Sequence, residues 1–271
     1  MVLVNNKYLE YFKQGFKKSV EYKSYIIGTL TTPIFMGVFF YFIWQYIFLV
    51  KGGGDPNFTI GGFTFKEMII YLVIGLLINT ARASEISDSI SQVIKSGDIA
   101  IFLCRPVNFV KSLLSDGMGA KVINLGTFFI LLLVITQVSG VGFPTPKIFA
   151  LFLVYGGLLV FFDIVINVII GGLAFWLTEI WGVRSSIQQI MWILSGRAIP
   201  LSLFPSMMQS FLAWTPFLYL EYTFASIYLG KLAFNEALYA MGIFMIWIAI
   251  MLVVLKFIFW RGFKKLSSFG G

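Results

Sequence analysis

The sequence contains no histidine and only one cysteine, Cys104, among its 271 residues. A single cysteine excludes a disulfide bond within the chain, and the lack of histidine excludes the common His/Cys zinc clusters and most catalytic triads. A G-x-x-x-x-G-K-[ST] phosphate-binding loop is also missing, which excludes an ATP site of that type. The residues that usually carry enzyme chemistry are therefore largely absent.

Charged residues are scarce too, since they make up 12% of the chain where a soluble domain has about 25%. Hydrophobic residues make up 59% and aromatic residues 18%, and the mean hydropathy is +0.90. Such a chain needs an apolar solvent, so the composition predicts an all-α integral membrane protein with residues 1–271 as a single transmembrane domain. The net charge of +8 then points to the anionic lipids of the inner leaflet and not to nucleic acid.

Six apolar segments predict six membrane-spanning helices, because a helix needs about 20 apolar residues to cross a bilayer core about 30 Å thick. The segments are Tyr25–Val50, Phe65–Thr80, Val122–Val138, Ile148–Leu177, Ile187–Leu203 and Ala233–Phe259. The second segment is short, and the fifth is weak because it contains Gln188, Gln189 and Arg197.

The basic residues predict the orientation of these helices, since cytoplasmic segments carry an excess of lysine and arginine. With both termini in the cytoplasm, 15 of the 20 basic residues lie inside. The basic residues outside are then Lys51, Lys66, Lys147, Arg197 and Lys231. This asymmetry predicts a multi-pass protein of the cell membrane with cytoplasmic termini, and it supports an even number of spans.

Residues 1–23 predict an amphipathic helix that lies in the inner membrane interface. One side of this helix is rich in lysine and glutamate. The apolar residues that recur at helical spacing on the opposite side are Leu9, Phe12, Phe16 and Val20. The helix either only anchors and orients the first span or also contacts a partner.

Residues 83–120 form a long polar segment after the second span, and their pattern predicts ordered structure. Apolar residues follow the spacing of an amphipathic helix: Ile86, Ile90, Val93 and Ile94. Gly97 can end that helix, because glycine adopts the left-handed conformation at little cost. Asp98 can cap a short helix from Ile99 to Leu103, and Pro106 suits the first turn of the next helix.

Residues 196–232 are a second unusual segment, because Pro200, Pro205 and Pro216 divide an apolar stretch into pieces too short to span a membrane. The pieces predict half-buried or re-entrant helices at the outer face. The alternative is that the fifth span continues through a kink.

Asp163 is the main ionisable residue inside a predicted span, in the stretch VFFDIVINVIIGG, with Asn167 one helical turn later. A charge in the middle of a membrane costs about 3 kcal/mol on insertion scales. Asp163 therefore either faces a substrate pathway or dimer interface, with Asn167, or lies near the outer third of the membrane, where it reaches the interface or is hydrogen-bonded to a neighbouring helix.

Two stretches carry a resemblance to a known family. SGDIAIFLCRPVN (Ser96–Asn108) is similar to the SG-x-apolar-x-x-L-x-RP pattern of a group of bacterial permeases. SGRAIPLSLFPSMMQSFLAWTPFLYL (Ser195–Leu220) is similar to the proline-containing segment before their last span. With six spans and the N-terminal helix in the same order, the chain resembles the type-2 permease family of ATP-binding-cassette (ABC) exporters.

The resemblance implies a transport subunit that is not an enzyme and has no cofactor, with ATP hydrolysed by two copies of a separate cytoplasmic ATPase. Two permease chains, identical or paralogous, would line one path for an amphipathic substrate such as a drug, a peptide or a lipid. Residues 83–120 would hold the main coupling helix, which docks on the ATPase. The stretch TEIWGVRSS (Thr178–Ser186) would be a lesser contact.

Six residues of the coupling loop are expected to present the ATPase contact or to fix the loop: Glu85, Asp88, Gln92, Lys95, Asp98 and Arg105. Arg105 has two further options, a lipid phosphate or an internal pair with Asp98. Two other functions stay open on the sequence alone. A stand-alone secondary transporter usually has several intramembrane ionisable groups. A membrane-embedded, lipid-modifying enzyme usually has histidine, paired aspartates or a metal site, and the sequence shows no such cluster.

Overall fold

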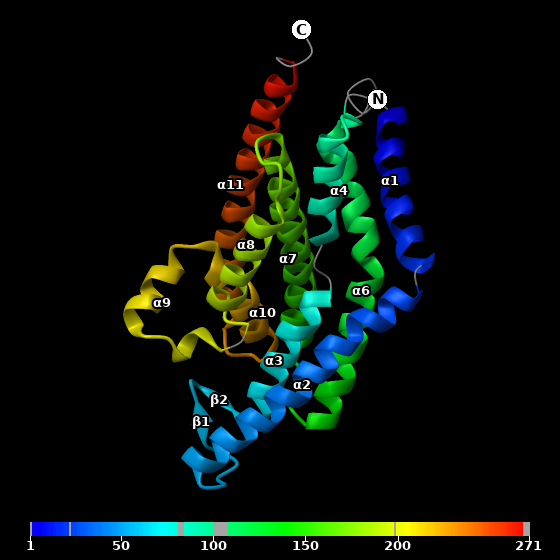
Figure 1. Ribbon diagram of the computed structural model, residues 1–271. Helices are drawn as coiled ribbons and strands as arrows, with labels where there is room; N and C mark the ends of the chain where they lie inside the picture. Colours follow the sequence, from blue (N-terminus) through cyan, green and yellow to red (C-terminus); the bar gives the residue numbers. More distant parts are fainter. Residues whose placement is uncertain (1, 22, 81–83, 100–107, 198, 268–271) are drawn as a thin grey trace.

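The computed structural model describes residues 2–21, 23–80, 84–99, 108–197 and 199–267, and helices make up most of this part of the chain (Figure 1). The longer helices are α1 (Val2–Glu21), α2 (Lys23–Gly52), α3 (Phe65–Thr80), α4 (Ser84–Lys95), α6 (Phe109–Ser139), α7 (Pro146–Gly172), α8 (Trp181–Leu194) and α11 (Phe234–Ser267). The shorter helices are α9 (Ser206–Ala213), α10 (Glu221–Tyr228) and the 3-10 helices η1 (Leu173–Phe175), η2 (Leu201–Leu203) and η3 (Pro216–Tyr219). Strands β1 (Thr59–Ile60) and β2 (Phe63–Thr64) form a small antiparallel hairpin between α2 and α3.

Among the described residues, four helical stretches are long and apolar enough to cross a membrane. They are Ile34–Gly52, Phe109–Ser139, Pro146–Phe175 and Phe234–Lys265. Helix α3 has 16 residues and α8 has 14, so at 1.5 Å per residue they reach only about 24 and 21 Å. As far as the structure describes them, both are shorter than a hydrocarbon core of about 30 Å. The all-α membrane class is confirmed with four candidate spans, and the count of six stays a prediction.

The expected third span is part of a longer helix, which starts close to the helix restart expected at Pro106. The expected helix, Val122–Val138, is only the second half of α6, which already begins at Phe109. The side chain of Asn108 accepts a hydrogen bond from the Lys111 N–H (3.1 Å) and caps this earlier start. The last part of the predicted loop is therefore the first part of a long helix.

The fifth expected span, Ile187–Leu203, is wrong at both ends, because α8 begins at Trp181 and ends at Leu194. Gly196 follows in the left-handed region, at φ +82°, where the helix cannot continue. Leu203 then belongs to the separate helix η2. A single kinked helix through Leu203 is therefore excluded, and short separate helices follow α8.

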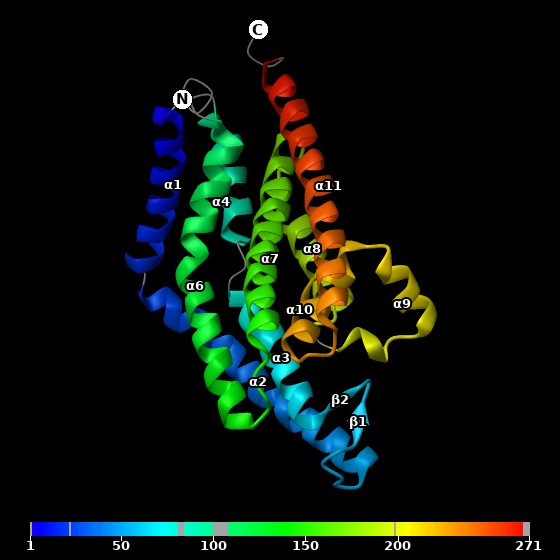
Figure 2. The ribbon, with the colours of Figure 1, turned by 180° about the vertical axis from the view of Figure 1, so that it is seen from behind.

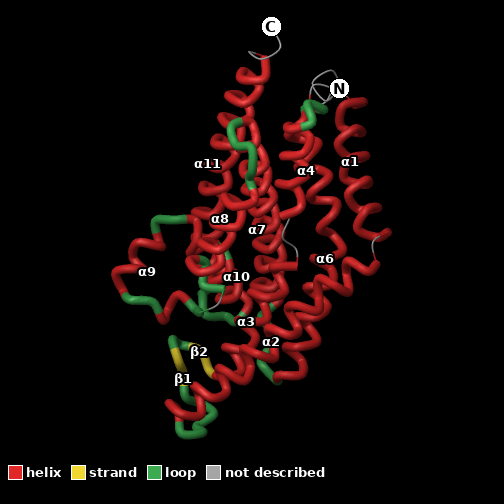
Figure 3. Tube along the Cα trace, in the orientation of Figure 1, coloured by secondary structure: helices red, strands yellow, loops and turns green. Residues whose placement is uncertain are grey.

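The N-terminal end of α1 and the C-terminal end of α11 lie at the same end of the molecule, opposite the β1–β2 hairpin (Figure 1). Helix α7 lies between α6 and α11 in views from both sides (Figure 2). Its aromatic side chains form the middle of the core, since Phe152 stacks on Phe224 of α10 with 4.2 Å between ring centroids. Tyr155 stacks on Phe244 of α11 at 5.3 Å. Helix α9 projects to one side of this bundle (Figure 3).

Candidate functional site

Helix α4, in the segment after α3, has one buried and one exposed face. The buried side chains are Ser87, Ile90, Ser91 and Ile94. The exposed side chains are Glu85, Ser89, Gln92 and Lys95. An acidic residue in the first turn and a basic residue in the last turn complement the helix dipole. The helix ends as the sequence predicts, because Gly97 lies in the left-handed region at φ +81°.

Glycines allow α4 to approach α6 and α7 closely. A Cβ atom on Gly171 of α7 would lie 2.8 Å from Cβ of Ile90, and one on Gly117 of α6 would lie 2.5 Å from Cδ1 of Ile86. Larger residues at these two positions would push α4 away from the bundle. The sequence predicts ordered structure for this segment. Within it, α4 is a helix packed on α6 and α7 and not a flexible linker.

Three ion pairs tie α4 to three other parts of the chain. They are Glu85–Lys121 of α6 (3.2 Å), Asp88–Arg184 of α8, and Lys95–Glu179 of the link between η1 and α8 (3.8 Å). The side chain of Lys121 is only 6% exposed and that of Arg184 only 15%, so both cations are largely withdrawn from solvent. Three of the residues expected at a partner contact thus also hold α4 within the chain.

Glu179 connects α4 to the start of α8. One of its carboxylate oxygens, Oε1, accepts hydrogen bonds from the N–H groups of Ile180 and Trp181, both at 3.0 Å. The bond from the Trp181 N–H and, after it, the charge of Lys95 lower the pKa of Glu179. The carboxylate therefore stays ionised and joins the end of α4 to the stretch Thr178–Ser186. The two segments that the resemblance implies as ATPase contacts lie side by side.

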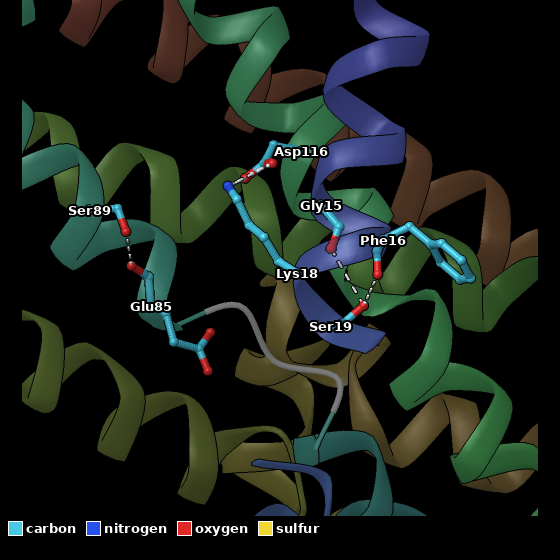
Figure 4. A network of polar contacts seen from close by, with 7 residues as sticks. All are labelled: Gly15, Phe16, Lys18, Ser19, Glu85, Ser89 and Asp116. Atoms are coloured by element: carbon cyan, nitrogen blue, oxygen red, sulfur yellow. Dashed lines mark hydrogen bonds and ion pairs between the residues drawn. The ribbon is translucent and has the colours of Figure 1, made fainter. Parts of the chain in front are cut away.

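Helix α1 packs along the first half of α6. A Cβ atom on Gly15 would lie 2.0 Å from the backbone oxygen of Asp116, and one on Gly119 would lie 1.9 Å from that of Phe12. Lys18 of α1 reaches Asp116 of α6, with 3.0 Å between Nζ and Oδ1 (Figure 4). Residues Val2–Glu21 form a helix where one was expected, and this helix is fixed to α6, which also supplies an ion-pair partner to α4. Its position in the membrane interface stays a prediction.

The other residues predicted for the contact have different outcomes. Gln92 is exposed on α4. Asp98 accepts a hydrogen bond from the Ser96 hydroxyl (2.7 Å) in the turn after α4. Arg105 and Pro106 lie outside the described residues. Of the expected short helix Ile99–Leu103, only Ile99 is described. The pairing of Arg105 with Asp98 therefore stays a prediction.

Sequence reasoning missed the partners of α4 and α1. They are Asp116, Lys121, Glu179 and Arg184. No local pattern identifies the partner of a charged residue that lies far away in the sequence. The glycines do carry a signal, because glycine is unfavourable within a helix unless it allows another helix to approach.

Asp163 and Asn167 form a local pair on α7. The Nδ2 atom of Asn167 donates hydrogen bonds to the backbone oxygen of Asp163 (2.9 Å) and to its Oδ2 (3.2 Å). Asp163 also lines a cavity of about 20 Å³ together with Met191 and Glu221. This volume holds about one water molecule and no amphipathic cargo. These hydrogen bonds join two residues of the same helix, and both the pathway role and the expected bond to a neighbouring helix stay predictions.

The comparison with known families agrees with this architecture. The family described as ABC-2 family transporter protein matches residues 25–270, which include every described helix from α3 to α11 and nearly all of α2. No curated protein matches the sequence. Members of the matching family are membrane components of transporters and have no ATP site of their own. The chain belongs to the ABC-2 transporter family and is a multi-pass membrane permease subunit of an ABC transporter.

Proposed function

We propose that this permease serves an exporter and that α4 is the coupling helix, which receives the motion of a cytoplasmic ATPase. The observation that carries the proposal is the set of three ion pairs from α4 to α6, α8 and the link before α8. A helix held at several points moves together with the elements it is tied to, as a rigid-body transition requires. Its exposed face, which includes Gln92, is available for the ATPase.

We propose six spans, with α3 and α8 as the short second and fifth ones and both termini in the cytoplasm. The end of α4, the start of α8 and the last turns of α11 share one end of the molecule (Figure 1). Most of the basic residues fall in segments near this end, as the positive-inside rule expects for a cytoplasmic face. Helix α3 is short but needs little lipid-facing length, because Met68, Ile70 and Ile74 are fully buried.

The short helices after α8 fit a re-entrant segment at the outer face. Met207 on α9 is 86% exposed, and Trp214, which directly follows α9, is 85% exposed. Apolar side chains presented in this way favour an apolar environment over water. Two permease chains, identical or paralogous, would then form one path for an amphipathic substrate (a drug, a peptide or a lipid-like molecule), driven by two ATPase copies.

Affinity purification of the tagged chain from membranes in a mild detergent tests the proposed function. We expect an ABC ATPase subunit to co-purify in stoichiometric amount. A secondary transporter or a lipid-modifying enzyme predicts no such partner. Recovery of the chain without an ATPase, together with transport that continues without ATP, would overturn the proposal.

A further inference from the structure

A groove runs along the C-terminal part of α11, beside the residue that follows η1. It has a volume of about 510 Å³ and is lined by Trp176, Phe257, Ile258, Arg261, Lys264 and Lys265. Half of these side chains are apolar or aromatic and half are basic, and none is acidic. The groove therefore combines an apolar wall with a concentrated positive charge.

The position of the groove is fixed by close packing of α11 on η1. A Cβ atom on Gly262 would lie 2.2 Å from the ring of Phe175, so glycine is needed for this approach. The Nζ atom of Lys265 donates a hydrogen bond to the backbone oxygen of Phe175 (3.0 Å). These contacts hold α11 and η1 together at the bottom of the groove.

Aromatic rings position the basic groups. Lys264 Nζ lies 3.8 Å from the centre of the Trp260 ring, and Arg261 lies 5.5 Å from the same ring and 5.4 Å from that of Phe257. Cation–π contacts of this kind restrict a cation without neutralising it. The two cations are thus held close together in the lining of the groove.

We infer that this groove binds an anionic phospholipid, with its phosphate on Arg261 and Lys264 and part of an acyl chain against Trp176 and Phe257. Arginine and lysine are the usual partners of phosphate oxygens. Tryptophan and basic residues at the end of an apolar helix mark the level of the lipid headgroups. The site is separate from α4, so the inference does not depend on the proposed ATPase contact.

Native mass spectrometry of the purified protein tests the site, with phosphatidylglycerol, phosphatidylcholine and soluble glycerol 3-phosphate as separate probes. We expect retention of phosphatidylglycerol over phosphatidylcholine and no retention of glycerol 3-phosphate. The double variant R261Q/K264Q should weaken phosphatidylglycerol binding about tenfold. The control K17Q/K111Q removes the same charge from exposed positions on α1 and α6 and should bind as the unmodified protein does.

Equal retention of phosphatidylglycerol and phosphatidylcholine would overturn the inference. An equal loss of phosphatidylglycerol binding in R261Q/K264Q and K17Q/K111Q would also overturn it, because it would indicate only a general effect of charge. Binding of glycerol 3-phosphate at the strength of the lipid would identify a site for free phosphates and overturn it too. If R261Q/K264Q does not fold, the single variant K264Q replaces it, because Lys264 is exposed.

Discussion

Asp88 of α4 accepts a hydrogen bond from Arg184 of α8, a residue 96 positions away in the sequence. The Lys95–Glu179 pair joins the same two parts of the chain one or two turns further along α4. A displacement of α4 is therefore transmitted directly to the start of α8. This connection is the basis of the coupling role proposed for α4.

Reversing the charges of this pair tests the connection. Asp88 is half exposed, so solvent screens the pair, and we expect each single variant, D88R or R184D, to lose about 1 kcal/mol of stability. The thermal unfolding midpoint in detergent should then fall by about 2–4 °C. The double variant D88R/R184D should recover most of this loss. Losses that simply add in the double variant would show that the two residues do not interact.

The glycine contact between α1 and α6 gives a second prediction. In G119L, the new side chain would overlap the backbone of α1, and overpacking of this kind costs about 1–3 kcal/mol. We expect α1 to leave α6 and a short thiol cross-linker between K18C and D116C to stop reacting, in a chain where Cys104 is serine. The matched control is G126L, on the same helix, where a Cβ atom meets no other atom within 4 Å. Equal cross-linking in both variants would contradict the packing of α1.

The buried pair of Arg197 and Glu221 gives a third prediction. The two side chains are 5% and 6% exposed and join the residues after α8 to α10. Removing one partner of a buried pair leaves an uncompensated charge, so R197M or E221Q should each cost about 3–5 kcal/mol. The double variant R197M/E221M should be more stable than either single variant, because it removes both charges. Denaturant unfolding in detergent measures these differences, and a double variant weaker than both single variants would contradict the argument.

The role of Asp163 is tested by D163N. The amide oxygen of asparagine can accept the hydrogen bond from Asn167 in place of the carboxylate. We expect the variant to assemble normally and to give cells the same resistance to a transported compound, because the Asp163–Asn167 pair only stabilises α7. A folded D163N protein that has lost transport would instead place Asp163 in the substrate pathway.

The parts of this fold that follow a local pattern could be predicted from the sequence. The start of α3 at Phe65 and the end of α4 before Gly97 are examples, since the start of an apolar run and glycine conformation are local properties. The packing around the start of α6 at Phe109 could not be predicted in this way. The first turns of α6 are covered by α1 and α4, which only the tertiary structure brings there.

In the candidate site, too, the local sequence pattern predicts the helix but not the partners of its residues. The amphipathic pattern identified Glu85, Asp88 and Lys95 as residues of one helix in the coupling segment. Their partners on α6, α8 and the link before α8 depend on how distant helices pack, and no spacing in the sequence encodes that.

The most direct test of the coupling role is photocross-linking from α4 in cells. A photoreactive phenylalanine analogue replaces Gln92, which is exposed on α4, or, as a control, Asn57, which is exposed near the hairpin at the opposite end of the molecule. We predict a covalent product with the ATPase subunit from position 92 and none from position 57. A product from position 57, or none from position 92 in a complex that still contains the ATPase, would contradict the role of α4.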